Sequence, residues 1–146
     1  MKPRGFTLVE LLISMTLLGI IGASGLTMWQ RAQKNQALSE SANQLESILI
    51  NAHNFSRDFR QERAWGVESL DINSYALVSQ NSTGEKKIEE EKTLISPIQF
   101  SETFDVFFDP GTGKLNGPAT IVLQESNTRF ATIKINEFGA TSIEIK

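Results

Sequence analysis

The feature that most constrains this chain is a long apolar run at its N-terminus. The 23 residues from Phe6 to Met28 are apolar or small, apart from five hydroxyl side chains and Glu10. A helix needs about 20 such residues to cross the hydrocarbon core of a bilayer. Glu10 lies inside the run, where an unpaired carboxylate costs about 3 kcal/mol. The run therefore predicts a membrane span whose one charged side chain needs a partner.

The residues on either side of the run predict its orientation. Lys2 and Arg4 precede it, and basic residues stay on the cytoplasmic side of a span. The bulk of the chain should therefore face outward. A cleaved secretory signal is the main alternative, but such a signal has an apolar core of about 7–15 residues with the cleavage site after it. This run is longer and carries an acid, which disfavours that alternative.

The segment Arg4-Gly-Phe-Thr-Leu-Val-Glu10 resembles the N-terminus of the type IV filament family, which comprises type IV pilins and the pseudopilins of type II secretion. The resemblance implies cleavage by prepilin peptidase between Gly5 and Phe6, followed by N-methylation of Phe6. It also implies a single-pass protein of the bacterial inner membrane with its C-terminal domain outside the cytoplasm. Other pilin or pseudopilin subunits, the inner-membrane assembly platform and membrane lipid would be its partners.

Glu10 has a physical role in this setting. Cleavage would give Phe6 a cationic amine four residues before Glu10, and buried charges persist in apolar surroundings when they are paired. Our hypothesis is that Glu10 pairs with the Phe6 amine of an adjacent subunit and sets the axial register of a filament. The alternative is that Glu10 faces an aqueous leak or extends to the cytoplasmic interface.

The helix is predicted to continue beyond the membrane. No Pro or Gly interrupts residues 26–65, and apolar residues recur at helical spacing: Leu38, Ala42, Leu45, Leu49, Ala52 and Phe59. We expect one helix from Phe6 to about Gln61, ended by Trp65-Gly66. The predicted divisions are a leader (1–5), a transmembrane helix (6–29), an amphipathic helix (30–61) and a β domain (62–146).

The last part of the chain alternates in the manner of β-strands separated by turns. Turns are expected at Asn81–Gly84, Asp109–Gly113, Ser126-Asn127 and Asn136–Gly139, and the charged run Glu85–Lys92 as an exposed hairpin or loop. The expected strands are Ala64–Val67, Ser74–Ser79, Ile98–Phe100, Thr103–Phe108, Thr120–Leu123, Arg129–Ile135 and Thr141–Lys146. The predicted fold class is α+β and pilin-like, with the long helix packed on a small antiparallel sheet.

The residue types disfavour catalysis and nucleic-acid binding. The chain has no Cys and one His, His53, which is expected on the polar surface of the helix, and no nucleophile elbow or P-loop appears. We therefore expect no enzyme, no cofactor and no metal; a calcium loop at Asp105–Gly113 is disfavoured because calcium takes about 6–8 oxygen ligands. Cleavage after Gly5 would leave 12 basic against 17 acidic side chains, a net charge of −5, so no nucleic-acid partner is expected.

Two later segments extend the resemblance. Val106-Phe-Phe-Asp-Pro-Gly-Thr-Gly113 and Ile135-Asn-Glu-Phe-Gly139 are similar to segments of the H-type minor pseudopilin and its relatives among type IV minor pilins. Together with the absence of Cys, this resemblance implies a minor structural subunit near the filament tip. Two alternatives stay open: a DNA-uptake (competence) minor pilin, which would need a basic patch, and a single-pass anchored enzyme or receptor domain.

Overall fold

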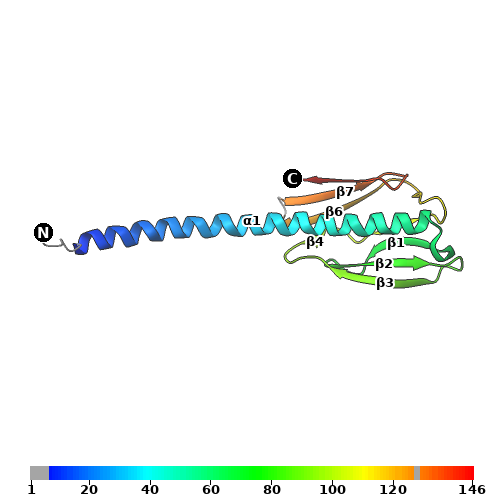
Figure 1. Ribbon diagram of the computed structural model, residues 1–146, viewed down its shortest axis with the longest axis horizontal. Helices are drawn as coiled ribbons and strands as arrows, with labels where there is room; N and C mark the ends of the chain where they lie inside the picture. Colours follow the sequence, from blue (N-terminus) through cyan, green and yellow to red (C-terminus); the bar gives the residue numbers. More distant parts are fainter. Residues whose placement is uncertain (1–6, 127–128) are drawn as a thin grey trace. The chain divides into compact units, whose positions relative to one another are not determined.

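The computed structural model describes residues 7–126 and 129–146. These residues form two compact units, the first ending at Asn35 and the second comprising Gln36–Lys146. One helix, α1 (Leu8–Arg57), begins in the first unit and ends in the second (Figure 1). A run of residues without Pro or Gly from 26 onward favours this continuity.

The end of α1 differs from the prediction. The helix stops at Arg57, and a short 3₁₀ turn, η1 (Arg60–Glu62), follows it. Phe59 and Gln61 have φ values of 52° and 57°, and this left-handed region is disfavoured for residues with a Cβ and incompatible with a right-handed helix. The predicted end at about Gln61 is therefore wrong by one helical turn.

In the described residues, eight strands form two antiparallel four-stranded sheets. Sheet A has the order β3-β2-β1-β5, made of β1 (Ala64–Ser69), β2 (Ser74–Gln80), β3 (Lys86–Thr93) and β5 (Asp105–Phe108). Sheet B has the order β4-β6-β7-β8, made of β4 (Gln99–Phe100), β6 (Ala119–Ser126), β7 (Arg129–Ile135) and β8 (Thr141–Ile145). The predicted α+β fold class is confirmed. The single sheet that we expected is divided into two sheets.

Three predictions about the β half can be compared with the structure. Trp65-Gly66 lies within β1 and does not end the helix. A Cβ on Gly66 would collide with the Val106 carbonyl oxygen and the Phe107 ring, so this glycine permits the close approach of β1 and β5. The charged run 85–92 forms the exposed edge strand of a hairpin with β2. Asn127, in the third predicted turn, lies outside the described residues.

The core of the second unit lies where α1 meets both sheets (Figure 1). Five of the six predicted stripe residues are buried: Leu38, Ala42, Leu45, Leu49 and Ala52. The sixth, Phe59, is exposed because α1 has already ended. Sheet A contributes Trp65, Val67, Tyr75, Leu77, Val106 and Phe108 to the core, and sheet B contributes Phe100, Ile121, Leu123, Ala131, Ile133 and Ile135.

Ser56 joins the end of α1 to the sheet. This fully buried side chain accepts a hydrogen bond from the Trp65 N–H at 2.7 Å, and its hydroxyl donates to the Phe108 carbonyl at 3.0 Å. The Ser56 carbonyl accepts from the Gly111 N–H at 2.7 Å. Since buried polar groups need partners, these bonds fix where β1, β5 and the 109–113 turn meet the helix.

His53 is not the surface residue that the sequence led us to expect. Its side chain is half-buried, and its ring lies 5.4 Å from that of Phe108, edge to face. The turns containing Gly113 and Gly139 close over it so tightly that a Cβ at either glycine would overlap the imidazole. The imidazole therefore serves as a packing element between two turns.

Candidate assembly site

The first candidate site is the N-terminal turn of α1, which contains Glu10. Thr7 donates to the Glu10 carboxylate from its N–H at 3.3 Å and from its hydroxyl at 3.2 Å. The Glu10 N–H in turn donates to Thr7 Oγ1 at 3.3 Å. This reciprocal arrangement is a capping box. Sequence reasoning assigned Glu10 to assembly and missed Thr7, although the Thr-x-x-Glu spacing is a readable signal.

The cleavage and methylation residues cannot be placed in this geometry. Gly5 and Phe6 lie outside the described residues, so the contact between Glu10 and a Phe6 amine stays a prediction. The capping box supplies Glu10 with one amide and one hydroxyl donor. Hydrogen bonds from neutral donors are weaker than those from a cation, so Glu10 still gains from a charged partner.

The rest of the first unit presents apolar side chains to its surroundings. Every large apolar side chain from Leu8 to Trp29 is 53–77% exposed. By length and composition, α1 includes a stretch able to cross a membrane. Monomeric soluble proteins rarely expose contiguous apolar patches beyond a few hundred Å². This surface therefore needs a cover from lipid or from other chains.

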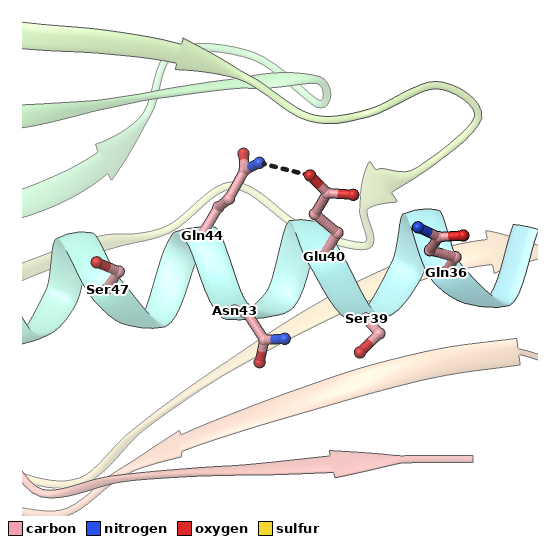
Figure 2. A pocket seen from close by; sticks show the side chains of 6 residues that line it. All are labelled: Gln36, Ser39, Glu40, Asn43, Gln44 and Ser47. Atoms are coloured by element: carbon pink, nitrogen blue, oxygen red, sulfur yellow. Dashed lines mark hydrogen bonds between the residues drawn. The ribbon is translucent and has the colours of Figure 1, made fainter. Parts of the chain in front are cut away.

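In the second unit, the face of α1 that the sheets leave uncovered is polar (Figure 2). It lines an open groove of about 520 Å³, formed by Gln36, Ser39, Glu40, Asn43, Gln44 and Ser47. Gln44 donates to Glu40 at 3.4 Å, and Glu40 is the one ionisable side chain in the lining. The groove is therefore a polar surface, in which the Glu40 carboxylate is bonded to Gln44.

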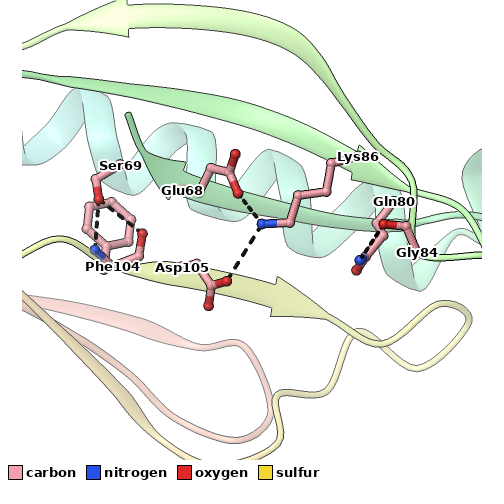
Figure 3. Close-up of polar contacts among 7 residues, drawn as sticks. All are labelled: Glu68, Ser69, Gln80, Gly84, Lys86, Phe104 and Asp105. Atoms are coloured by element: carbon pink, nitrogen blue, oxygen red, sulfur yellow. Dashed lines mark hydrogen bonds and ion pairs between the residues drawn. The ribbon is translucent and has the colours of Figure 1, made fainter. Parts of the chain in front are cut away.

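The charged side chains of sheet A are used in surface pairs. Figure 3 shows the Lys86 ammonium between Glu68 and Asp105; it is paired with Glu68 and lies 3.7 Å from Asp105. Beside it, the Phe104 N–H donates to the Ser69 hydroxyl oxygen at 2.8 Å, and the Ser69 N–H donates to the Phe104 carbonyl at 2.9 Å. Surface ion pairs such as those of Lys86 contribute about 0–1 kcal/mol to the stability of the fold. The Lys86 pairs link β1, β3 and β5.

The Asp105–Gly113 segment forms a strand and a turn. The Asp109 N–H donates to the Lys114 carbonyl and the Gly113 N–H to the Asp109 carbonyl, both at 2.8 Å. Within residues 7–126 and 129–146, no group of three or more His, Cys, Asp or Glu side chains is placed to hold a metal ion. The predicted turn is confirmed.

Two comparisons with known proteins bear on this arrangement. The prokaryotic N-terminal methylation motif matches residues 1–26. Among solved structures, the chain is similar to the minor pseudopilin EpsH from the Type 2 Secretion System of Vibrio cholerae, with a TM-score of 0.58 and 13% sequence identity. That match covers 74% of this chain and 96% of EpsH. No curated protein sequence matches the chain.

The motif and the fold agree with each other and with the resemblance read from the sequence. Together with the apolar helix they support a membrane-anchored subunit of a pilus or pseudopilus. The N-terminus of this chain matches the prokaryotic N-terminal methylation motif, and the fold of the chain is similar to that of a minor pseudopilin.

Proposed function

We propose that this protein is a minor structural subunit of a type II secretion pseudopilus or a type IV pilus. The observation that carries the proposal is the first unit, in which a methylation motif leads into an uncovered apolar helix with one internal carboxylate. Such a helix is stable only in lipid or against other helices. The protein would act by packing: its first helical half joins a filament core, and its second unit forms the filament surface.

Maturation would proceed at the boundary between leader and helix. Prepilin peptidase would cleave between Gly5 and Phe6, and methylation would follow on Phe6. The leader (1–5), the transmembrane helix (6–29) and the β domain (62–146) remain our proposed divisions, and the amphipathic helix that begins at residue 30 ends at Arg57. The protein would reside in the inner membrane, with the β domain outside the cytoplasm, until the assembly platform moves it into an extracytoplasmic filament.

Glu10 would direct the assembly step. In the membrane its carboxylate is held by the Thr7 capping box, and an unpaired acid at that depth costs about 3 kcal/mol. In a filament the Phe6 amine of a neighbouring subunit would form a charge pair with Glu10 and so offset the cost of the unpaired carboxylate. Phe6 and Glu10 are four residues apart, which is about 6 Å along a helix. A parallel neighbour shifted along the axis by that distance would bring its Phe6 amine to the level of Glu10.

The secretion pseudopilus is favoured over a DNA-uptake pilus. The solved structure with a similar fold is named as a type II secretion protein, and the processed chain would carry a net charge of −5. Binding to DNA rests on neutralised phosphates. Salt-dependent DNA binding by the processed chain would instead favour the competence alternative.

The first experiment is mass analysis of the N-terminus of the membrane-extracted protein, produced with prepilin peptidase. We expect a chain that begins at a methylated Phe6. An intact Met1 would overturn the proposal, and would favour a singly anchored enzyme or receptor.

The second experiment compares two acids of the same helix. Glu10→Ala should reduce incorporation into filaments by at least about tenfold, because it leaves the Phe6 amine of the neighbouring subunit unpaired. An unpaired charge in a span costs about 3 kcal/mol, and about 1.4 kcal/mol is tenfold in an equilibrium. Glu46→Ala is the matched control, because Glu46 accepts a hydrogen bond from Thr141 at 2.7 Å within its own chain. Normal incorporation of Glu10→Ala would refute the pairing and leave the interfacial alternative.

A further inference from the structure

Asn116 differs from the other asparagines of the chain. It is the one asparagine that a glycine follows. Asn116 and Gly117 lie in a bend between the 109–113 turn and β6, and the Asn116 side chain is exposed. Glycine has no Cβ that could hinder an attack by its nitrogen on the preceding side chain. The pair is therefore suited to a reaction between its own two residues.

The fold holds neither of the two reacting groups. Within residues 7–126 and 129–146, neither the Asn116 amide nor the Gly117 N–H has a hydrogen-bond partner. Gly117 has a φ of +124°, and a Cβ placed there would meet nothing within 4 Å. The bend therefore has room for the rotation that brings the Gly117 nitrogen onto the Asn116 side-chain carbon.

Hydrogen bonds oppose the same reaction at the other described asparagines outside α1. Asn81 Oδ1 accepts two backbone N–H groups of its own turn at 3.1 and 2.8 Å. Asn136 Oδ1 accepts two in the same way at 3.0 and 2.9 Å. After Asn73, the attacking nitrogen would be that of Ser74, whose N–H donates to Asp71 at 2.7 Å. Within α1, the N–H that follows each asparagine belongs to the helical hydrogen-bond ladder.

We propose that Asn116 is a site of spontaneous deamidation, an inference that does not depend on the proposed function. The Gly117 nitrogen attacks the Asn116 Cγ and forms a new C–N bond. The bond from Cγ to the amide nitrogen breaks, and ammonia leaves with the proton of the Gly117 N–H. Water then opens the succinimide at either carbonyl, which gives aspartate or isoaspartate at position 116. The net change is loss of one ammonia and uptake of one water, so no oxidant or reductant is needed.

The product changes the charge of one surface of the second unit. Asn116 and Gly117 line an open crevice of about 280 Å³ beside β5, and Asp105 lines the same crevice. The Lys86 ammonium near Asp105 is already paired with Glu68. A carboxylate at position 116 would therefore be a second negative charge in this crevice, and it adds to a processed chain that carries −5. Isoaspartate would also lengthen the backbone of the bend.

Peptide mass mapping of the full chain tests the proposal. The chain is kept in detergent micelles in mildly alkaline buffer, and samples are digested over time. We expect the peptide that contains Asn116 to gain the mass difference between an amide and an acid, with aspartate and isoaspartate products separated by fragmentation. Peptides with Asn81 and Asn136 are internal controls and should change more slowly. Asn116→Gln is the matched variant, because its longer side chain would have to close a larger ring, and it should stay unmodified.

Gly117→Ala tests the attacking group. Its Cβ should slow the mass gain about tenfold, which corresponds to about 1.4 kcal/mol in the barrier. Because Gly117 has a positive φ, the rates of wild type and variant are also compared in urea, where strain in the folded bend plays no part. No mass gain at Asn116, equal rates at Asn81 or Asn136 in the folded chain, an equal gain in Asn116→Gln, or an unslowed Gly117→Ala in urea would each overturn the proposal.

Discussion

The two halves of α1 share one backbone conformation and have opposite surroundings. In the first half Leu17 is 55% exposed, whereas in the second half Leu45 is fully buried. The second half is covered by its own chain, through the apolar faces of sheets A and B. The first half receives no cover from the described residues of its chain. The comparison teaches that apolar content predicts a need for cover, while the partner that supplies it depends on the rest of the fold.

The two halves of α1 therefore contribute their burial energy to different processes. Burial of apolar surface contributes about 25 cal/mol per Å² wherever it occurs. In the second half this energy stabilises the folded unit, and in the first half it becomes available only on entry into lipid or a filament. Substitutions in the two halves should therefore alter different measurements.

The largest effect is expected from matched leucines. Leu45→Ala should lower the free energy of unfolding of the second unit by about 2–5 kcal/mol, because it leaves a cavity in the core. Leu17→Ala should change it by less than about 0.5 kcal/mol. The measurement is urea unfolding of the full chain in detergent micelles, followed by fluorescence of the buried Trp65 in a Trp29→Phe background. Equal losses for the two leucines would break the comparison.

Glycines give the second test. Gly139→Ala should cost about 1–3 kcal/mol through overpacking, because the new Cβ would overlap His53 and the residue has a φ of +79°. Gly84→Ala, with φ +88° and only the Gln80 amide nearby at 4.0 Å, isolates the backbone strain. Gly19→Ala meets nothing within 4 Å in the helix interior and should cost nothing, since Ala is the better helix former.

A double-mutant cycle with His53→Ala separates the clash from the strain. We expect a coupling of about 1 kcal/mol or more between His53 and Gly139, measured by the same urea unfolding. Additive losses would show that the imidazole is not what resists a side chain at Gly139.

The last test concerns Tyr75, the one tyrosine of the chain, and its effect appears only at alkaline pH. Burial, with a further contribution from Glu90, raises the pKa of Tyr75 to about 12. The unfolded chain ionises near pH 10, so the stabilisation is complete below pH 10 and is lost as the pH rises through about 12. Ultraviolet titration of tyrosinate should give the higher midpoint in the folded chain. A midpoint near 10 would show that solvent reaches the Tyr75 hydroxyl.

Tyr75→Phe is the companion variant. The hydroxyl of Tyr75 is buried and has no hydrogen-bond partner among the described residues. Its ring packs edge to face on Phe100 at 5.9 Å, a contact that phenylalanine would keep. We expect no loss of stability at neutral pH and the disappearance of the alkaline transition.

Local patterns predicted most elements of this fold. Helical spacing found the buried stripe from Leu38 to Ala52, and alternation found β7 with the observed bounds, Arg129–Ile135. The charged run before Lys92 was harder to classify, because an edge strand needs backbone partners on one side only and can keep charged side chains. The end of α1 was missed because left-handed residues such as Phe59 and Gln61 have no local signature.

The candidate site divides along the same line. Gly5, Phe6 and Glu10 were read from residue type and spacing, and the methylation motif matches the residues that contain them. The packing around His53 could not be read in this way. Gly113 and Gly139 come from separate turns, and only the folded sheets bring both against the imidazole.

The long helix, its apolar first half with Glu10 inside it, and the antiparallel β half could be predicted from the amino-acid sequence, because each depends on the spacing of neighbouring residues. Three features became visible only in the folded chain: the strands divide into two sheets, β1 lies between β2 and β5, and His53 is packed under two turns. These features depend on pairing between segments far apart in the chain. Their energies come from shape and register between surfaces, which a single segment does not encode.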